Sequence, residues 1–212
     1  MADVYCFGDS ITRGENDPLH GGWVDRLKRL FIARGLREGD EEVCVFNLGI
    51  GGETTRSLKS RFLPEFEARA ADKGRAVVVL AYGANDAAQA DGVFLVAPGP
   101  FLDNLKECIR AARKKKAVVL LLNVTPVASA AEDRASPGGK VRRGAFIRRY
   151  NAGLKKLAGK EKVTLIDVYQ GFVERGLGTL FSADGIHPNA EGHELIYDLA
   201  LPALQNALKT LR

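Results

Sequence analysis

The chain of 212 residues contains little cysteine and little histidine, and both shortages narrow the kinds of protein it can be. Its three cysteines are Cys6, Cys44 and Cys108, and an odd number at such wide spacing predicts neither a disulfide framework nor a zinc site. The three histidines show no ligand spacing with cysteine or acidic residues either. We therefore expect free thiols, no metal and no bound cofactor.

Long apolar runs are missing as well. None approaches the length of about 18 residues that a membrane span needs. The N-terminus enters a strand-like run at once, without the basic segment, apolar segment and cleavage site of a secretory signal. Together with the free thiols, these absences predict a cytoplasmic protein without a membrane span.

Charge of one sign is in modest excess, with a formal net charge of +5. No basic motif is interleaved with aromatic residues, as in many nucleic-acid-binding segments. The positive charge is therefore interpreted as solvated surface, and we expect no nucleic-acid partner. The sequence carries no signal for an oligomeric state.

What the chain does contain is a regular alternation of two patterns. Short runs rich in valine, leucine and isoleucine predict strands buried on both faces, and they span residues 4–7, 43–48, 76–81, 117–124 and 163–168. Amphipathic patterns predict helices over residues 23–34, 54–71, 100–115, 146–157 and 190–211. The alternation predicts a single α/β domain over residues 1–212, with a parallel sheet between two layers of helices.

Polar and glycine-rich segments follow the predicted strands directly. They cover residues 8–10, 49–55, 82–86 and 125–139. In a parallel sheet the carboxyl ends of the strands share one edge, where ligands bind. We therefore expect these segments to meet, although they lie far apart in the sequence.

Ser10 follows the first predicted strand, and Gly8 permits a tight turn that would expose its hydroxyl. The segment is not the Gly-x-Ser-x-Gly elbow of the α/β-hydrolases, because Thr12 occupies the final glycine position. Capping of a following helical turn by Asp9 and Ser10 is the alternative to a nucleophilic role.

Two further segments could stabilise a developing oxyanion. Gly49, Gly51 and Gly52 allow backbone N–H groups to turn toward a ligand, and the side-chain amide of Asn85 could donate to the same atom. The alternatives are an ordinary glycine-rich turn for the first segment and a local Asx turn for the second.

Asp184 and His187 lie three residues apart in a turn that contains Gly185 and Pro188. This spacing brings a carboxylate to one ring nitrogen and leaves the other free, as a general base requires. The alternative is a loop histidine at the start of a helix. For the two other histidines, His20 and His193, a surface or helix-packing role is the favoured interpretation.

Taken together, four segments resemble the blocks of the GDSL/SGNH hydrolase family of lipases and esterases. In chain order they are Gly8-Asp9-Ser10, Gly52 with Glu53 and Thr54, Gly83-x-Asn85-Asp86, and Asp184-x-x-His187-Pro188. The chain differs in carrying Ile11 where the first block has leucine. It also carries Gly51 and Glu53 where many members have serine and aspartate.

The resemblance implies a flavodoxin-like three-layer α/β/α sandwich around a five-stranded parallel sheet. It implies Ser10 as the nucleophile, His187 as the base and Asp184 as the residue that orients the histidine. The N–H groups of Ser10 and Gly52 and the amide of Asn85 would form the oxyanion hole.

The implied activity is hydrolysis of a carboxylic ester, with a small or short-acyl ester as the expected substrate. Two alternatives remain open: an acyltransferase with the same site, and a non-catalytic flavodoxin-like domain that binds a phosphate-bearing ligand. Residues 127–144 form a long loop-like segment that is either a lid over the site or a surface excursion.

Overall fold

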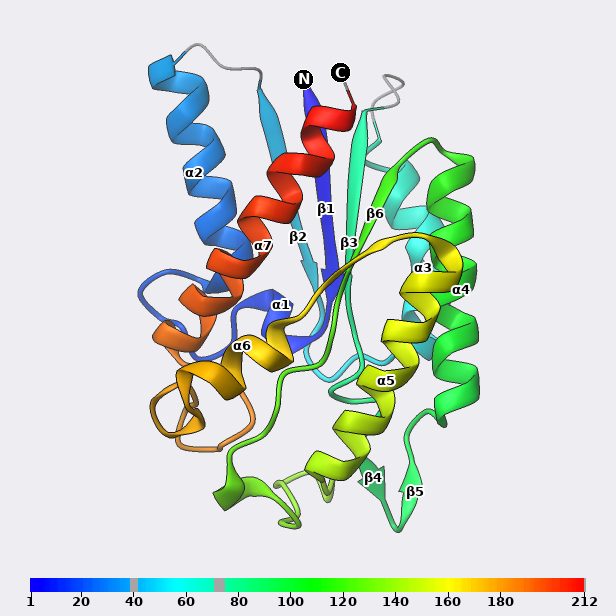
Figure 1. The fold of residues 1–212 in the computed structure, drawn as a ribbon, viewed down its shortest axis with the longest axis vertical. Helices are drawn as coiled ribbons and strands as arrows, with labels where there is room; N and C mark the ends of the chain where they lie inside the picture. The colour runs from blue at the N-terminus through cyan, green and yellow to red at the C-terminus, as the bar shows by residue number, and fades with distance from the viewer. Residues whose placement is uncertain (39–41, 71–74, 212) are drawn as a thin grey trace.

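Helices cover both faces of a central parallel sheet in the computed structural model, which describes residues 1–38, 42–70 and 75–211. Figure 1 shows α2 (Gly22–Glu38) and α7 (Ala190–Thr210) on one side of the sheet. The helices α3 (Thr55–Glu67), α4 (Pro98–Lys114) and α5 (Gly144–Glu161) lie on the other side. This is the predicted three-layer sandwich.

The sheet has five parallel strands in the order β2-β1-β3-β6-β7. The strands are β1 (Ala2–Gly8), β2 (Val43–Gly49), β3 (Ala76–Ala81), β6 (Val118–Leu122) and β7 (Thr164–Ile166). Each corresponds to one of the predicted apolar runs. The strand order reverses between β1 and β3, which is the flavodoxin-like arrangement and the place where such sheets bind ligands.

Several boundaries and short elements differ from the sequence-based expectation. The fifth apolar run was expected to stay extended to Val168, but Asp167 caps a helix there, α6 (Val168–Arg175), by accepting from the N–H of Gln170. The predicted helix over residues 54–71 ends at Glu67, and residue 71 lies outside the described residues.

Five short elements were not among the predicted helices and strands. They are α1 (Ser10–Arg13), whose turn entered only as the capping alternative for Asp9 and Ser10, the 3-10 helices at Ser129–Ala131 and Leu177–Thr179, and the hairpin strands β4 (Gln89–Ala90) and β5 (Val93–Phe94). Their sequences are too short to show an apolar period.

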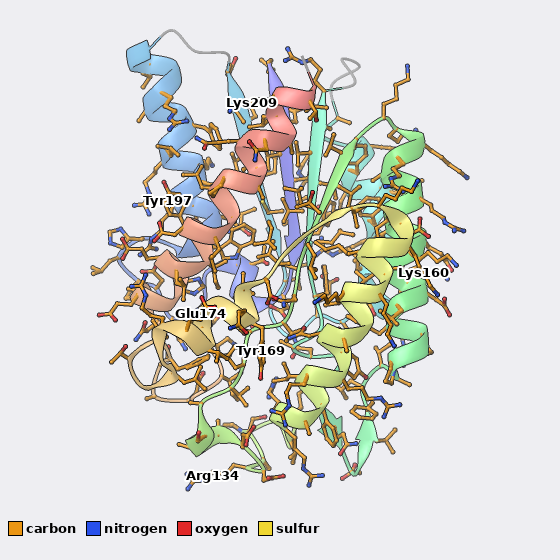
Figure 2. All side chains as sticks on the ribbon, viewed as in Figure 1. Arg134, Lys160, Tyr169, Glu174, Tyr197 and Lys209 are labelled. Atoms are coloured by element: carbon orange, nitrogen blue, oxygen red, sulfur yellow. The ribbon has the colours of Figure 1, made fainter. Side chains whose placement is uncertain are left out.

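Alternate residues of the strands supply two cores, one on each face of the sheet. In β1, Tyr5 and Phe7 pack under α3, α4 and α5, while Val4 and Cys6 pack under α2 and α7. Figure 2 shows side chains filling the space between the sheet and both helical layers. Because both faces are covered, the strands contain apolar residues at consecutive positions, as the sequence indicated.

The carboxyl ends of the strands point away from the two termini, toward the end of the molecule that carries β4, β5 and residues 127–144 (Figure 1). In Figure 2, Arg134 of this segment lies at the opposite end of the molecule from Lys209, near the C-terminus. In the described part of the chain, no helix has the length and apolar character needed to cross a membrane.

Candidate active site

A chain of hydrogen bonds joins Ser10, His187 and Asp184 at the carboxyl edge of the sheet. The Ser10 hydroxyl lies 2.8 Å from Nε2 of His187. The other ring nitrogen, Nδ1, lies 2.6 Å from Oδ2 of Asp184. Both contacts are hydrogen bonds when Nδ1 carries the ring proton and donates to Asp184, while Nε2 accepts from the Ser10 hydroxyl. This is the tautomer that a general base needs.

Local structure explains why the Ser10 hydroxyl is available. Asp9, not Ser10, caps α1, because its Oδ1 accepts from the N–H of Ile11 at 3.0 Å. Gly8 has no room for a side chain, since a Cβ there would lie 1.9 Å from Oγ1 of Thr12. The turn after β1 therefore leaves Ser10, which is 9% exposed, with its hydroxyl toward His187.

A tight turn holds Asp184 against His187. Oδ1 of Asp184 accepts from the N–H groups of Ile186 at 2.9 Å and of His187 at 3.0 Å, so the carboxylate is fixed before it meets the ring. Burial disfavours its ionised form, but the hydrogen bonds from His187 and Ile186 outweigh burial and lower the pKa of Asp184. The carboxylate is therefore maintained in the form that can orient a histidine.

The glycine-rich segment after β2 forms a turn beside Ser10. The N–H of Ile50 donates to the carbonyl of Gly8 at 3.0 Å, and the N–H of Glu53 donates back to Ile50 at 3.2 Å. Gly52 has φ of 75°, a conformation that favours glycine, and it is exposed. The turn thus leaves Gly52 at the surface of the site.

A buried ionic network stabilises this turn on the side that faces α3 and the sheet. Arg61 of α3 donates to Glu53 Oε1 at 2.7 Å and to the carbonyl of Leu48 at 2.7 Å. Tyr82 donates to Glu53 Oε2 at 2.5 Å and accepts from Arg61 at 2.9 Å. The role of Arg61 was not predicted, because an arginine on an amphipathic helix is normally a surface residue.

Asn85 is buried at the end of the segment that follows β3. Its Nδ2 donates to the carbonyl of Glu53 at 3.1 Å and to Oδ2 of Asp9 at 3.3 Å. Its Oδ1 accepts from Arg142 at 3.2 Å. The amide therefore connects the glycine-rich turn to the residue before Ser10, and the expected convergence of the strand-end segments is found.

Two buried carboxylates flank the site. Burial raises the pKa of Asp9 to about 6, against the effects of the Ile11 N–H, His187 and Arg142. Burial likewise raises the pKa of Asp86 to about 6, although Thr55 donates to its Oδ1 through the backbone N–H at 2.9 Å and through the hydroxyl. Asp86 thereby attaches the start of α3 to the segment that follows β3.

Residues 127–144 pack against the histidine loop. The N–H of Ala128 donates to the carbonyl of Gly185 at 2.8 Å, and Val141 pairs with Gln89 beside the β4 hairpin. One residue of this segment, Arg142, reaches Asn85, and no feature of the sequence distinguished it from its neighbour Arg143. That the segment opens and closes as a lid stays a prediction.

The two remaining histidines lie apart from this chain of bonds. His20 is exposed, and His193 is buried in α7 with Nε2 at 2.9 Å from the carbonyl of Glu15. Burial lowers the pKa of His193, which favours its neutral form. Across the described ranges, no three histidine, cysteine or acidic side chains gather as they would around a metal ion.

A parallel α/β sandwich with serine, histidine and aspartate joined at its carboxyl edge has the architecture of the SGNH hydrolases. The chain belongs to the GDSL-like lipase/acylhydrolase family, which matches residues 6–195. Family membership confirms the resemblance seen in the sequence. It identifies the protein as a GDSL-like esterase or acylhydrolase, a hydrolase that acts on esters.

Individual relatives are distant. The chain is 27% identical over 207 residues to a GDSL lipase of Mycobacterium tuberculosis, covering 97% of this chain and 82% of the relative. It is 27% identical over 228 residues to an uncharacterized lipoprotein of Bacillus subtilis, covering 92% and 86%. The crystal structure of the lipase/acylhydrolase from Enterococcus faecalis is 28% identical, with a TM-score of 0.77 over 97% of this chain and 96% of that one. The last match confirms the predicted fold.

Proposed function

We propose that the protein hydrolyses a carboxylic ester through an acyl-enzyme formed on Ser10. The observation that carries this proposal is the unbroken chain from the Ser10 hydroxyl through both ring nitrogens of His187 to Asp184, with contacts of 2.8 and 2.6 Å. His187 takes the proton as Ser10 attacks the acyl carbon and returns it to the departing alcohol. Water then attacks the acyl carbon with His187 again as the base. The bond from the acyl carbon to Ser10 breaks, His187 returns the proton to the Ser10 oxygen, and the carboxylic acid leaves.

The negative charge on the acyl oxygen requires fixed donors. We assign this role to Nδ2 of Asn85 and to the N–H groups of Ser10 and Gly52. The position of Asn85 supports the assignment, because its Nδ2 lies between Glu53, the residue after Gly52, and Asp9, the residue before Ser10. An amide NH2 has two protons, so donation to the substrate oxygen takes the place of the longer of these contacts, 3.3 Å to Asp9. Ser10 begins a helix, and the N–H of a first helical residue has no partner within that helix.

The proposed substrate is a small or short-acyl ester. An acyltransferase would use the same residues with an alcohol in place of water in the second step. Family membership favours both enzymes over a phosphate-binding domain. Product analysis with p-nitrophenyl acetate and increasing ethanol distinguishes them, because a transferase forms ethyl acetate at a rate that exceeds acetate release.

The decisive test is covalent labelling with a fluorophosphonate probe, followed by peptide mass spectrometry. We expect the label on Ser10 in the wild-type protein and none in Ser10→Ala. Ser60→Ala is the matched control, because Ser60 is exposed on α3 and its hydroxyl donates only to the carbonyl of Ser57. A label on another residue, or ester hydrolysis that persists in Ser10→Ala, would refute the proposal.

A further inference from the structure

Arg142 is a buried cation in an unusual position. Arg142 is 8% exposed, and among the described residues its one hydrogen bond to a side chain runs from Nη2 to Oδ1 of Asn85 at 3.2 Å. Its Nε is buried without a hydrogen-bond partner in the described part of the chain. A guanidinium has five N–H donors, and the one on Nε is thus withheld from both protein and solvent.

No carboxylate of the described residues lies within ion-pair distance of Arg142. Burial lowers the pKa of Arg142, while the more distant charges of Asp9 and Asp184 oppose that shift. A buried charge with so few partners destabilises a folded protein. Such an arrangement is expected where the charge serves a purpose other than stability.

The backbone holds Arg142 in this position. The preceding residue, Val141, exchanges two hydrogen bonds with Gln89, at 2.8 and 2.9 Å. The carbonyl of Arg142 accepts from the N–H of Asp133 at 3.1 Å. Backbone hydrogen bonds on both sides of Arg142 thus place its guanidinium beside Asn85.

The contact determines which way the Asn85 amide faces. If the amide were flipped, its NH2 group would face the Arg142 guanidinium and its oxygen would face the carbonyl of Glu53. Both contacts would then be repulsive. With Oδ1 held by a cation, Nδ2 is turned toward the carbonyl of Glu53 and Oδ2 of Asp9, the neighbours of Gly52 and Ser10. A hydrogen bond from a charged group to the amide oxygen also strengthens the amide N–H groups as donors.

We propose that Arg142 is a positioning residue of the oxyanion site, acting through Asn85. It holds Nδ2 of Asn85 toward the reacting carbonyl, and its charge makes the amide a stronger donor as negative charge develops on the substrate oxygen. This inference rests on the proposed function. It makes Arg142 important for the transition state and unimportant for binding of a neutral ester.

The test is a double-variant cycle on a neutral substrate, p-nitrophenyl acetate. The variants are Arg142→Met, Asn85→Ala and the two combined, each checked for folding by circular dichroism and thermal unfolding. Arg143→Met is the matched control, because Arg143 is the next residue but is exposed, pairs with Asp133 and lies over the ring of Phe146. Fluorophosphonate labelling of Ser10 in the wild-type protein is measured first.

We expect Arg142→Met to lower kcat about ten- to a hundredfold, with KM changed by less than about twofold. In the Asn85→Ala background, Arg142→Met should lower kcat by less than about threefold, because the amide through which Arg142 acts is absent. Arg142→Lys keeps the charge without the planar fork, so it should lie between wild type and Arg142→Met. It also serves as the measured variant if Arg142→Met does not fold.

Three results would overturn the inference: an unchanged kcat, a loss confined to KM, or the same fold-loss with and without Asn85. A loss seen only with an anionic ester, such as p-nitrophenyl hemisuccinate, would also overturn it, because Arg142 would then bind substrate. If the wild-type protein neither labels at Ser10 nor hydrolyses the ester, the proposed function fails and this inference with it. If labelling and hydrolysis persist but the double-variant cycle shows no coupling between Arg142 and Asn85, only the role of Arg142 is rejected and the proposed function stands.

Discussion

The Ser10 hydroxyl lies 2.8 Å from Nε2 of His187, although 177 positions separate the two residues in the chain. Ser10 follows β1, and His187 precedes α7, which packs on the sheet face that carries Val4 and Cys6 of β1. The loop before α7 therefore reaches the end of β1. A contact of this length allows direct proton transfer, which is the geometric requirement for a general base.

Replacing Asn85 tests the proposed oxyanion hole directly. Asn85→Ala removes a fixed donor, and loss of one such donor typically lowers kcat by about two to three orders of magnitude. Steady-state hydrolysis of p-nitrophenyl acetate measures the effect. Asn206→Ala, at an exposed position of α7, is the control and should leave kcat unchanged. Full turnover in Asn85→Ala would remove this side chain from the mechanism.

Replacing Asp184 tests the orientation of His187. In Asp184→Asn an amide takes the place of the carboxylate that accepts from Nδ1 at 2.6 Å. The neutral amide neither selects the required tautomer nor stabilises the imidazolium, so kcat should fall at least about a hundredfold. The measurement is kcat per labelled Ser10, with the exposed Asp198→Asn as control. Equal rates for both variants would contradict the assignment.

The fold was predictable because its signals are local. The buried strands are continuous apolar runs that can be recognised in the sequence. The segments around Ser10 and Asn85 follow strands and that around His187 precedes a helix, and in a parallel sheet such segments meet at the carboxyl edge. The last strand was predicted to extend too far, to Val168. This error could have been recognised, because aspartate is a common helix-capping residue and Asp167 caps α6.

The contacts that surround the site were not predictable. Arg142 meets Asn85 because Val141 pairs with Gln89 in the backbone, and such pairing leaves no mark on the side-chain pattern. Arg61 occupies a helix position that resembles a solvated one, and its buried partner Glu53 lies in a turn. Both contacts depend on how loops and a helix pack, which the periodicity of the sequence does not encode.

Arg61 should be a major contributor to stability. Its side chain is 15% exposed, and that of its partner Glu53 is 4% exposed. Arg61→Met would leave the Glu53 carboxylate buried without its cation, which typically costs about 3–5 kcal/mol. Urea unfolding measures the loss. Arg69→Met is the control, because it breaks an ion pair in which the Arg69 side chain is 36% exposed and that of Glu65 is 29% exposed. It should change the free energy of unfolding by less than about 0.5 kcal/mol.

A second substitution separates the buried charge from lost packing around Arg61. Glu53→Gln in the Arg61→Met background removes the uncompensated charge while keeping the shape of the side chain. It should recover part of the lost free energy of unfolding. If the double variant is as unstable as Arg61→Met or less stable, the loss arises from packing of Arg61 over Phe7 and not from Glu53.

The two buried carboxylates predict how stability depends on pH. Burial raises the pKa of both Asp9 and Asp86 from 3.8 to about 6 in the folded protein. The folded state then holds protons that the unfolded chain releases, so the stability these groups contribute is full below about pH 4 and is lost as pH rises through about 6. Asp17, which lies in the loop before α2 and accepts from the N–H groups of His20 and Gly22, has a lowered pKa, as Asp184 does. These two groups act in the opposite direction and only at more acidic pH.

Asp86→Asn measures how much one of these carboxyl groups contributes to the pH dependence of stability. The amide oxygen can still accept from Thr55, but no charge forms as pH rises, so the variant should lose less stability than wild type between pH 4 and pH 7.5. A shift of about two pKa units corresponds to at most about 3 kcal/mol for this difference. Urea unfolding at both pH values measures it, with Asp103→Asn at an exposed position of α4 as control. Parallel pH profiles for Asp86→Asn and wild type would show that Asp86 is already ionised in the folded protein at pH 4.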